Sequence, residues 1–224
     1  MSRYFVGITG ASGHAYAEAL VRALVRAGED VDLCVTDAGC KVLRHELGVE
    51  AGVQGELLEA ALPGWLGEDV AAGVRTFRSD QIEAPAASGT SLTGGVLLCP
   101  CSMGTMARVS AGFSSNLVER AADVALKERR RLLIVPRETP MSAIHLENML
   151  RLARLGVQVV PASPGFYHRP QTIEDLVLHV VGKVLDALEI EHSLSARWKG
   201  MPRPTEDPGT GAPPPADPLA PGGA

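Results

Sequence analysis

Short β-rich runs alternate with helical patterns along most of this chain, and that alternation limits the possible folds more than any other feature. The expected strands are residues 4–9, 30–36, 74–77, 95–100, 132–136 and 157–162. The clearest helical patterns, with apolar residues three and four positions apart, are residues 14–27, 37–47, 116–129, 140–154 and 172–188. Such alternation predicts a parallel sheet with helices on both faces. We therefore predict a single α/β domain over residues 1–200, a three-layer αβα fold with a doubly wound parallel sheet.

The remaining segments differ in composition. Residues 49–73 and 78–94 are less periodic and rich in glycine and alanine, so we expect loops or an excursion from the sheet. Residues 201–224 hold eight of the sixteen prolines and no aromatic residue. This composition predicts a disordered tail.

Charge and apolar content restrict the class of partner. The 224 residues are 46% hydrophobic and carry a net charge of −5, which favours a small-molecule partner over nucleic acid. The first residues lack the apolar core of a signal peptide, and no later run is long enough to cross a bilayer, so we expect a cytoplasmic protein. The four cysteines form no CxxC pair, which favours buried or loop thiols over a metal site.

Ligands of doubly wound sheets bind outside the carboxyl ends of the strands. The first such loop, TGASG at 9–13, opens a helix, and its backbone N–H groups can face an anion or a ring edge. It also suits an NAD-type loop with Asp37 as the ribose acid, although Tyr16 stands where a third glycine or alanine is wanted. An NAD-dependent reductase is therefore one alternative.

The loop CSMGT at 101–105 repeats this arrangement after the fourth expected strand. Ser102 by itself is explained by a helix N-cap. Two such loops on one sheet edge nevertheless indicate a phosphorylated planar cofactor held from two sides.

Three further patterns have simple structural explanations. Arg120, Asp123 and Lys127 share one helix face, as in a solvated ladder with Asp123 four residues before Lys127. Thr139 and Pro140 suit the cap and first position of the next helix. His145 lies in HLEN, which is not HExxH, so a structural or intersubunit role is preferred to a metal site.

The sequence resembles the UbiX-type flavin prenyltransferases, formerly called aromatic acid decarboxylases, over about residues 4–200. The segments that carry the resemblance are GITGASG (7–13), CPCSMGT (99–105), NLVERAADVALKERRRLLIVPRETP (116–140), IHLENMLRLA (144–153) and FYHRPQTIEDLV (166–177). It implies a flavodoxin-like Rossmann fold and reduced FMN as co-substrate. It also implies transfer of a dimethylallyl group from dimethylallyl monophosphate to N5 and C6 of the flavin. The product, prenylated FMN, would serve a UbiD-type decarboxylase, and a homo-oligomer, commonly a dodecamer, is expected.

The resemblance also implies site residues. The expected flavin contacts are Gly10, Ala11, Ser12, Thr36, Ser102, Met103, Gly104, Thr105 and Arg137. The expected prenyl phosphate contacts, partly from neighbouring subunits, are Ser88, Lys127, Arg137, Tyr167 and Lys183, with Trp198 nearby. The expected catalytic residues are Ser12, Glu46, Arg120 and Glu138, with Glu138 in proton handling and Ser12 and Glu46 in deprotonation at the ring. The family commonly has arginine at position 183, and lysine keeps the charge without the bidentate fork.

Two other functions of the same fold stay as alternatives. One is a flavoprotein that decarboxylates a cysteine-type substrate, although a PxMNxxMW segment is missing and PRETP (136–140) stands instead. The other is a non-catalytic FMN carrier. No aspartate-rich metal motif is visible, so we expect two lysines and one arginine to neutralise the leaving phosphate without a metal.

Overall fold

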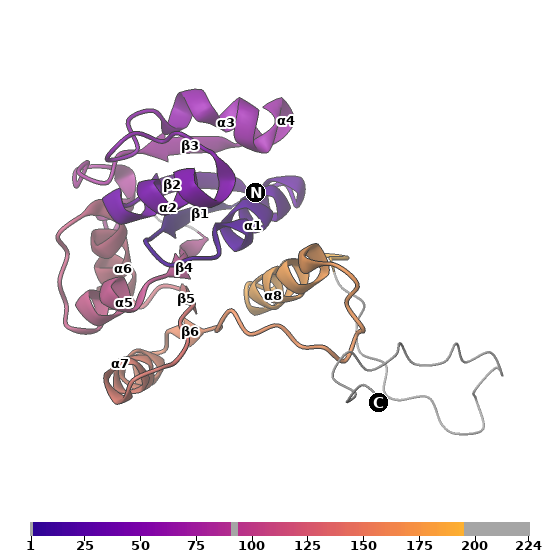
Figure 1. Ribbon diagram of the computed structural model, residues 1–224. Coiled ribbons are helices and arrows are strands. Elements are labelled where there is room, and N and C mark those ends of the chain that lie inside the picture. Colours follow the sequence, from indigo (N-terminus) through magenta and orange to yellow (C-terminus); the bar gives the residue numbers. More distant parts are fainter. Residues whose placement is uncertain (1, 91–93, 195–224) are drawn as a thin grey trace, which may run out of the picture.

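The described residues of the computed structural model, 2–90 and 94–194, form a six-stranded parallel sheet with helices on both faces (Figure 1). Its strands are β1 (Arg3–Ile8), β2 (Asp30–Val35), β3 (Val74–Phe77), β4 (Gly95–Cys101), β5 (Leu132–Pro136) and β6 (Gln158–Val159). Their order is β3-β2-β1-β4-β5-β6, with every neighbouring pair parallel. This is the order of a Rossmann sheet, and it confirms the predicted doubly wound α/β fold. Trp198 and the tail at 201–224 lie outside the described residues.

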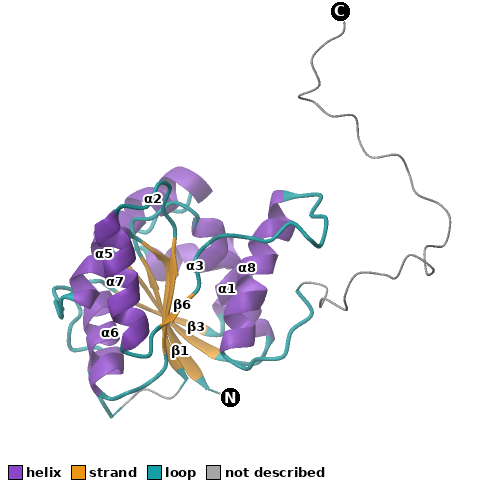
Figure 2. Ribbon diagram, turned by 90° about the horizontal axis from the view of Figure 1, so that it is seen from below, coloured by secondary structure: helices purple, strands orange, loops and turns teal. Residues whose placement is uncertain are grey.

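The helices form two layers. They are α1 (His14–Arg26), α2 (Asp37–Leu47), α3 (Leu58–Leu66), α4 (Glu68–Ala71), α5 (Met103–Ser110), α6 (Leu117–Lys127), α7 (Ala143–Arg154) and α8 (Ile173–Ala187), with a 3₁₀ turn η1 (Pro85–Ala87). Figure 2 shows α5, α6 and α7 on one side of the sheet and α1, α3 and α8 on the other.

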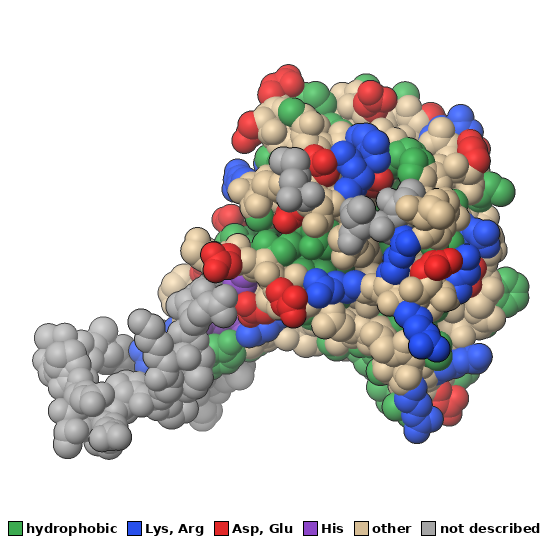
Figure 3. Space-filling model, turned by 180° about the vertical axis from the view of Figure 1, so that it is seen from behind, with side chains coloured by type: hydrophobic (Ala, Val, Ile, Leu, Met, Phe, Trp, Pro, Cys, Tyr) green, Lys and Arg blue, Asp and Glu red, His purple; other side chains and the backbone are tan. Residues whose placement is uncertain are grey.

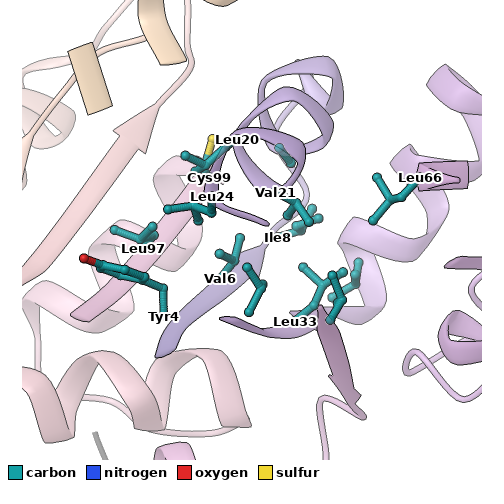
Figure 4. Packing of buried hydrophobic residues seen from close by; sticks show 14 of the residues in the cluster. Tyr4, Val6, Ile8, Leu20, Val21, Leu24, Leu33, Leu66, Leu97 and Cys99 are labelled. Atoms are coloured by element: carbon teal, nitrogen blue, oxygen red, sulfur yellow. The ribbon is translucent and has the colours of Figure 1, made fainter. Parts of the chain in front are cut away.

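Strands β1, β2, β4 and β5 contribute side chains to two separate cores because neighbouring residues point to opposite faces. In β1, Val6 and Ile8 pack with α1 residues such as Leu20 and Leu24 (Figure 4). Phe5, which directly precedes Val6, packs in the second core with α5 and α6. Both faces of β1 are therefore buried, as the continuous apolar run in the sequence requires.

Helix α3 is an element that the sequence pattern did not reveal. It lies within 49–73, where loops or an excursion were expected, and it includes Pro63. Leu58, Leu62 and Leu66 are nevertheless buried in the α1 core. Burial of this leucine face outweighs the low helix propensity of the proline and the following glycine.

The predicted start of α7 at Thr139 and Pro140 is wrong. The helix begins at Ala143, and the Ser142 hydroxyl caps it by accepting from the His145 amide at 3.3 Å. In return, His145 Nδ1 accepts from the Ser142 amide at 3.2 Å. The Thr139 hydroxyl instead donates to the Glu138 carbonyl, and the Thr139–Pro140 peptide is cis. The reciprocal cap at Ser142 leaves 137–142 as a loop, and it gives His145 the structural role that was expected.

Gly7 allows α6 to pack closely against β1. A Cβ at this position would lie 2.7 Å from Val118 Cγ1 and 3.0 Å from Leu98 Cδ2. Val118 and Leu98 are fully buried, so neither side chain has open space to move into.

We therefore expect Gly7→Ala to lower the free energy of unfolding by about 1–3 kcal/mol through overpacking. The matched control is Gly64→Ala in α3, where a Cβ would meet no atom within 4 Å. That change should be neutral or stabilise by roughly 0.5–1 kcal/mol, because alanine favours helix over glycine. Urea unfolding of both variants measures the difference, and equal stabilities would contradict the close approach.

Candidate functional site

Thr9 joins the two glycine-containing loops at the carboxyl ends of β1 and β4. Its hydroxyl donates to the Pro100 carbonyl at 2.8 Å and accepts from the Ser102 amide at 2.7 Å. The side chain is fully buried. Because β1 and β4 lie at the point where the strand order reverses, this contact marks the position at which such sheets bind ligands.

A polar cavity of about 490 Å³ opens beside this contact. Its lining includes five predicted flavin contacts: Gly10, Thr36, Ser102, Gly104 and Thr105. A Cβ on Gly10 would lie 2.7 Å from Ala38 Cβ, so glycine is required for the first loop to approach the start of α2. The volume falls within the roughly 300–1,000 Å³ of small-molecule and cofactor sites.

Two helices begin at this cavity. Thr36 caps α2 by accepting from the Gly39 amide at 3.2 Å, and Ser102 caps α5 by accepting from the Thr105 amide at 3.3 Å. The N-cap interpretation of Ser102 is thus confirmed, and the residue also lines the cavity. The positive ends of both helices favour an anionic or electron-rich ligand there.

Glu46 from α2 holds the start of α1. Its carboxylate accepts from the Gly13 amide at 3.0 Å and from the His14 amide at 2.9 Å. Gly13 has φ +104° and no side chain, so Glu46 supplies the capping oxygen that this helix lacks. Although burial raises the pKa of Glu46, hydrogen bonds from the Ser12 hydroxyl and from these two amides outweigh it and lower the pKa. The carboxylate is therefore ionised at neutral pH and orients Ser12.

Arg137 and Glu138 follow β5, and Arg137 reaches the first loop. Its Nε donates to the Ser12 carbonyl at 3.1 Å. Glu138 Oε1 accepts from the amide of Thr139 at 3.0 Å. Both charged residues are half-buried at the strand end, and Arg137 contacts the loop that carries Ser12.

An ion pair beside the cavity was missed by sequence reasoning. Glu119 is fully buried, and its carboxylate pairs with Arg108 Nε and accepts from the Ser115 amide at 2.9 Å. Arg108 Nη2 also donates to the Thr105 hydroxyl at 3.3 Å. The available signal was a glutamate on the apolar face of an amphipathic helix, between Val118 and Ala122, since a buried carboxylate requires a partner.

A larger cavity, of about 680 Å³, lies between α1 and α8. Its walls include Ala19 and Ala23 of α1 and Val177 of α8. None of the predicted site residues within the described ranges lines it. We assign the chemistry to the smaller cavity because five predicted flavin contacts line it.

All four cysteines are buried free thiols, as expected. Burial raises the pKa of Cys40 to about 11 and of Cys101 to about 12, so neither is a reactive thiolate. Within residues 2–90 and 94–194, no group of three or more potential ligands could hold a metal ion. No helix in these ranges is both long and apolar enough to cross a bilayer. On the face that Figure 3 shows, acidic and basic side chains are interspersed.

Comparison with known proteins identifies the family. The Flavoprotein family model matches residues 2–185. Flavin prenyltransferase UbiX of Halalkalibacterium halodurans is 48% identical over 195 residues, which cover 87% of this chain and 92% of that protein. This chain belongs to the UbiX flavin prenyltransferase family.

Two solved structures of UbiX-like proteins share the fold closely. The dodecameric FMN-dependent UbiX-like decarboxylase of Escherichia coli O157:H7 is 40% identical, with a TM-score of 0.77 over 88% of this chain and all of that one. AnUbiX (PadA1), solved in complex with FMN and dimethylallyl pyrophosphate, is 34% identical, with a TM-score of 0.78 over 90% of this chain and 99% of that one. Membership of the family confirms the predicted transferase class and FMN as the flavin.

Several other predicted site residues do not line the cavity of their own chain. Lys127 ends α6 and pairs with Glu128 at 2.8 Å, whereas the ladder expectation paired it with Asp123. Asp123 forms an ion pair with Arg120 instead, at 3.5 Å. Because Glu128 follows Lys127 directly where the helix ends, it competes successfully for the ammonium group. Ser88, before β4, contacts the Thr90 hydroxyl at 3.0 Å.

Tyr167 and Lys183 form a third group on the α8 side of the sheet. Tyr167 lies in the loop before α8, and its Oη is 3.0 Å from His179 Nε2. Lys183 is one turn further along α8 and pairs with Asp186 at 3.5 Å. His179, a residue that the sequence did not single out, contacts Tyr167 and lies one turn before Lys183 on α8.

We expect Glu46→Gln to weaken FMN binding roughly tenfold, because it removes charge-assisted hydrogen bonds that shape the first loop. The lowered pKa of Glu46 means that its stabilisation is complete above the ordinary value of 4.5. It is lost as the pH falls through the lower folded-state pKa. The Tm gap between wild type and variant should therefore be full at pH 7 and shrink below about pH 4.5.

The matched control is Glu50→Gln, since Glu50 is exposed and pairs with Arg44 on the surface at 3.2 Å. Fluorescence titration with FMN and thermal melts across pH measure both effects. If the two variants bound FMN with equal affinity and had equal Tm values across pH, Glu46 would have no role in the flavin site.

Proposed function

We propose that this protein transfers a dimethylallyl group from dimethylallyl monophosphate to N5 and C6 of reduced FMN. The product, prenylated FMN, would be used by a UbiD-type decarboxylase. The observation that carries the proposal is the hydrogen bond from Arg137 Nε to the Ser12 carbonyl, which sets a cation against the first glycine-containing loop. Membership of the flavin prenyltransferase family supports the same reaction.

The residues present fit FMN. Gly10 and Gly104 line a cavity of about 490 Å³, and the N-termini of α2 and α5 can hold polar or phosphate oxygens. Reduced FMN supplies the nucleophilic ring atoms. The protein's part is then to orient the two substrates, exclude water and move protons.

The leaving phosphate needs positive charge as it departs. Arg137 provides it from the flavin side, and Lys127, Lys183 and Tyr167 are proposed to complete the site. Asn116 lines the cavity, and Lys127 is eleven residues further along α6, which at about 1.5 Å per residue places it ~16 Å away. The Lys127 of the same chain is therefore poorly placed for that flavin, and we assign the role to a neighbouring subunit.

Helix α7 supports such an assembly. Ile144, Leu146 and Leu150 are 67%, 54% and 51% exposed, whereas Leu152 is fully buried. Exposed aliphatic side chains along one helix mark an interaction surface. The Escherichia coli relative is dodecameric, and together with this surface it favours a homo-oligomer, for which we propose a dodecamer.

Proton handling is assigned to groups around the first loop. We propose that Glu138 exchanges protons near the phosphate and that Ser12, held by Glu46, accepts a hydrogen bond from the ring. Arg120 and Lys127 are 41% and 55% exposed on α6, and both are proposed to face the flavin of a neighbouring subunit. The buried free thiols suit a reducing compartment, so we place the activity in the cytoplasm.

Anaerobic incubation with reduced FMN and dimethylallyl monophosphate should give a flavin product heavier by one prenyl group, detected by mass spectrometry. Dimethylallyl diphosphate, run in parallel, identifies the preferred donor, which matters because Lys183 lacks the fork of an arginine. We expect the monophosphate to be preferred. Absence of any prenyl adduct while both substrates are bound would refute the proposal.

In the same assay, Glu138→Gln should slow adduct formation about 100-fold or more, the usual contribution of a general acid or base. Its FMN affinity should stay close to that of wild type. Equal loss of binding and turnover would make Glu138 a structural residue.

A further inference from the structure

A buried histidine holds the loop before α8 against that helix. His179 is only 7% exposed. The Gly165 amide lies 3.2 Å from its Nδ1, and the Tyr167 hydroxyl lies 3.0 Å from its Nε2. Both ring nitrogens are therefore engaged by the loop that carries Tyr167, the tyrosine expected at the prenyl phosphate.

These two contacts determine where the protons lie. A backbone amide can only donate, so Nδ1 of His179 must accept and is unprotonated. A neutral imidazole then carries its hydrogen on Nε2, which donates to Tyr167 Oη. Since the tyrosine oxygen accepts from His179, its own hydrogen is directed to a different acceptor.

The surroundings keep His179 neutral. Burial is the largest cause that lowers the pKa of His179, and the nearby His168 and Lys183 lower this pKa further. Asp175 is one turn before His179 on α8 and Lys183 one turn after, while His168 and Tyr167 come from the loop. Because the neutral ring is favoured, the donor on Nε2 persists at physiological pH.

Packing fixes the orientation of the ring. His168 stacks on His179 with ring centres 4.9 Å apart and planes 5° from parallel. The Tyr167 ring meets His179 edge-on at 5.5 Å. A Cβ on Gly165 would lie 2.8 Å from Tyr167 Cε1 and 3.3 Å from His179 Cε1, so glycine permits this close approach.

We propose that His179 is a positioning residue that makes Tyr167 a hydrogen-bond donor to the phosphate of the prenyl substrate. This inference rests on the proposed prenyl transfer. Lys183, one turn from His179 on α8, would supply charge to the same phosphate. Gly165 and His179 thus set the direction in which the Tyr167 hydroxyl donates its hydrogen bond.

Two substitutions separate this role from packing. His179→Phe keeps a flat ring but removes the donor, whereas His179→Gln keeps an N–H near the position of Nε2. With reduced FMN saturating, we expect His179→Phe to raise KM for dimethylallyl monophosphate about tenfold, the effect of one hydrogen bond to a charged group. Its kcat should change less than about threefold, and His179→Gln should stay close to wild type.

A double-mutant cycle tests whether His179 acts through the tyrosine. Tyr167→Phe removes the hydroxyl, so Tyr167→Phe and the double variant with His179→Phe should have the same KM. A further tenfold rise in the double variant would overturn the inference. So would a His179→Phe protein that loses FMN binding and thermal stability together with donor affinity.

Calorimetric titration of dimethylallyl monophosphate into the FMN-loaded proteins separates this inference from the proposed function. If wild type binds the donor but forms no prenyl adduct, the proposed reaction is wrong, and the relative affinities of the variants still decide the role of His179. Equal donor affinity of wild type and His179→Phe would overturn the inference. No measurable binding by wild type would overturn it as well.

Discussion

The site depends on the buried hydroxyl of Thr9, which ties the ends of β1 and β4 together. Where the strand order reverses, the connections after the two neighbouring strands lead to opposite faces of the sheet, and the gap between them is where this fold binds ligands. Thr9 spans the gap with one donated and one accepted hydrogen bond. The two loops thus keep a fixed separation beside the cavity at which α2 and α5 begin.

Charge at this edge is arranged around Ser12. Glu46 approaches from α2 and stays ionised because amides and the Ser12 hydroxyl donate to it, while Arg137 approaches from β5 and binds the Ser12 carbonyl. One short loop is therefore held between a fixed anion and a fixed cation. Such prearranged groups need no reorganisation when charge develops on a leaving phosphate or a ring nitrogen.

The sheet, its class and the cavity loops were predictable because local patterns carry that information. Apolar runs predicted the strands, and Gly10 and Ser102 indicated the loops that follow two of them. Helix α3 was not predictable from periodicity because Pro63 and Gly64 interrupt it, and only its burial against α1 shows why it forms. The contacts of Glu119 with Arg108 and of His179 with Tyr167 each depend on how one element packs against the segment before it, which periodicity does not show.

In one chain the cavity lies at the start of α6 and Lys127 at its end, which is why we propose that a complete site draws on more than one subunit. Co-expression of Lys127→Ala and Arg137→Ala chains tests this most directly. Each variant alone should be nearly inactive. Mixed oligomers should recover about a quarter of wild-type prenyl transfer, because half of the flavin sites keep Arg137 and half of their neighbours keep Lys127. Mixed oligomers no more active than either variant would contradict the account.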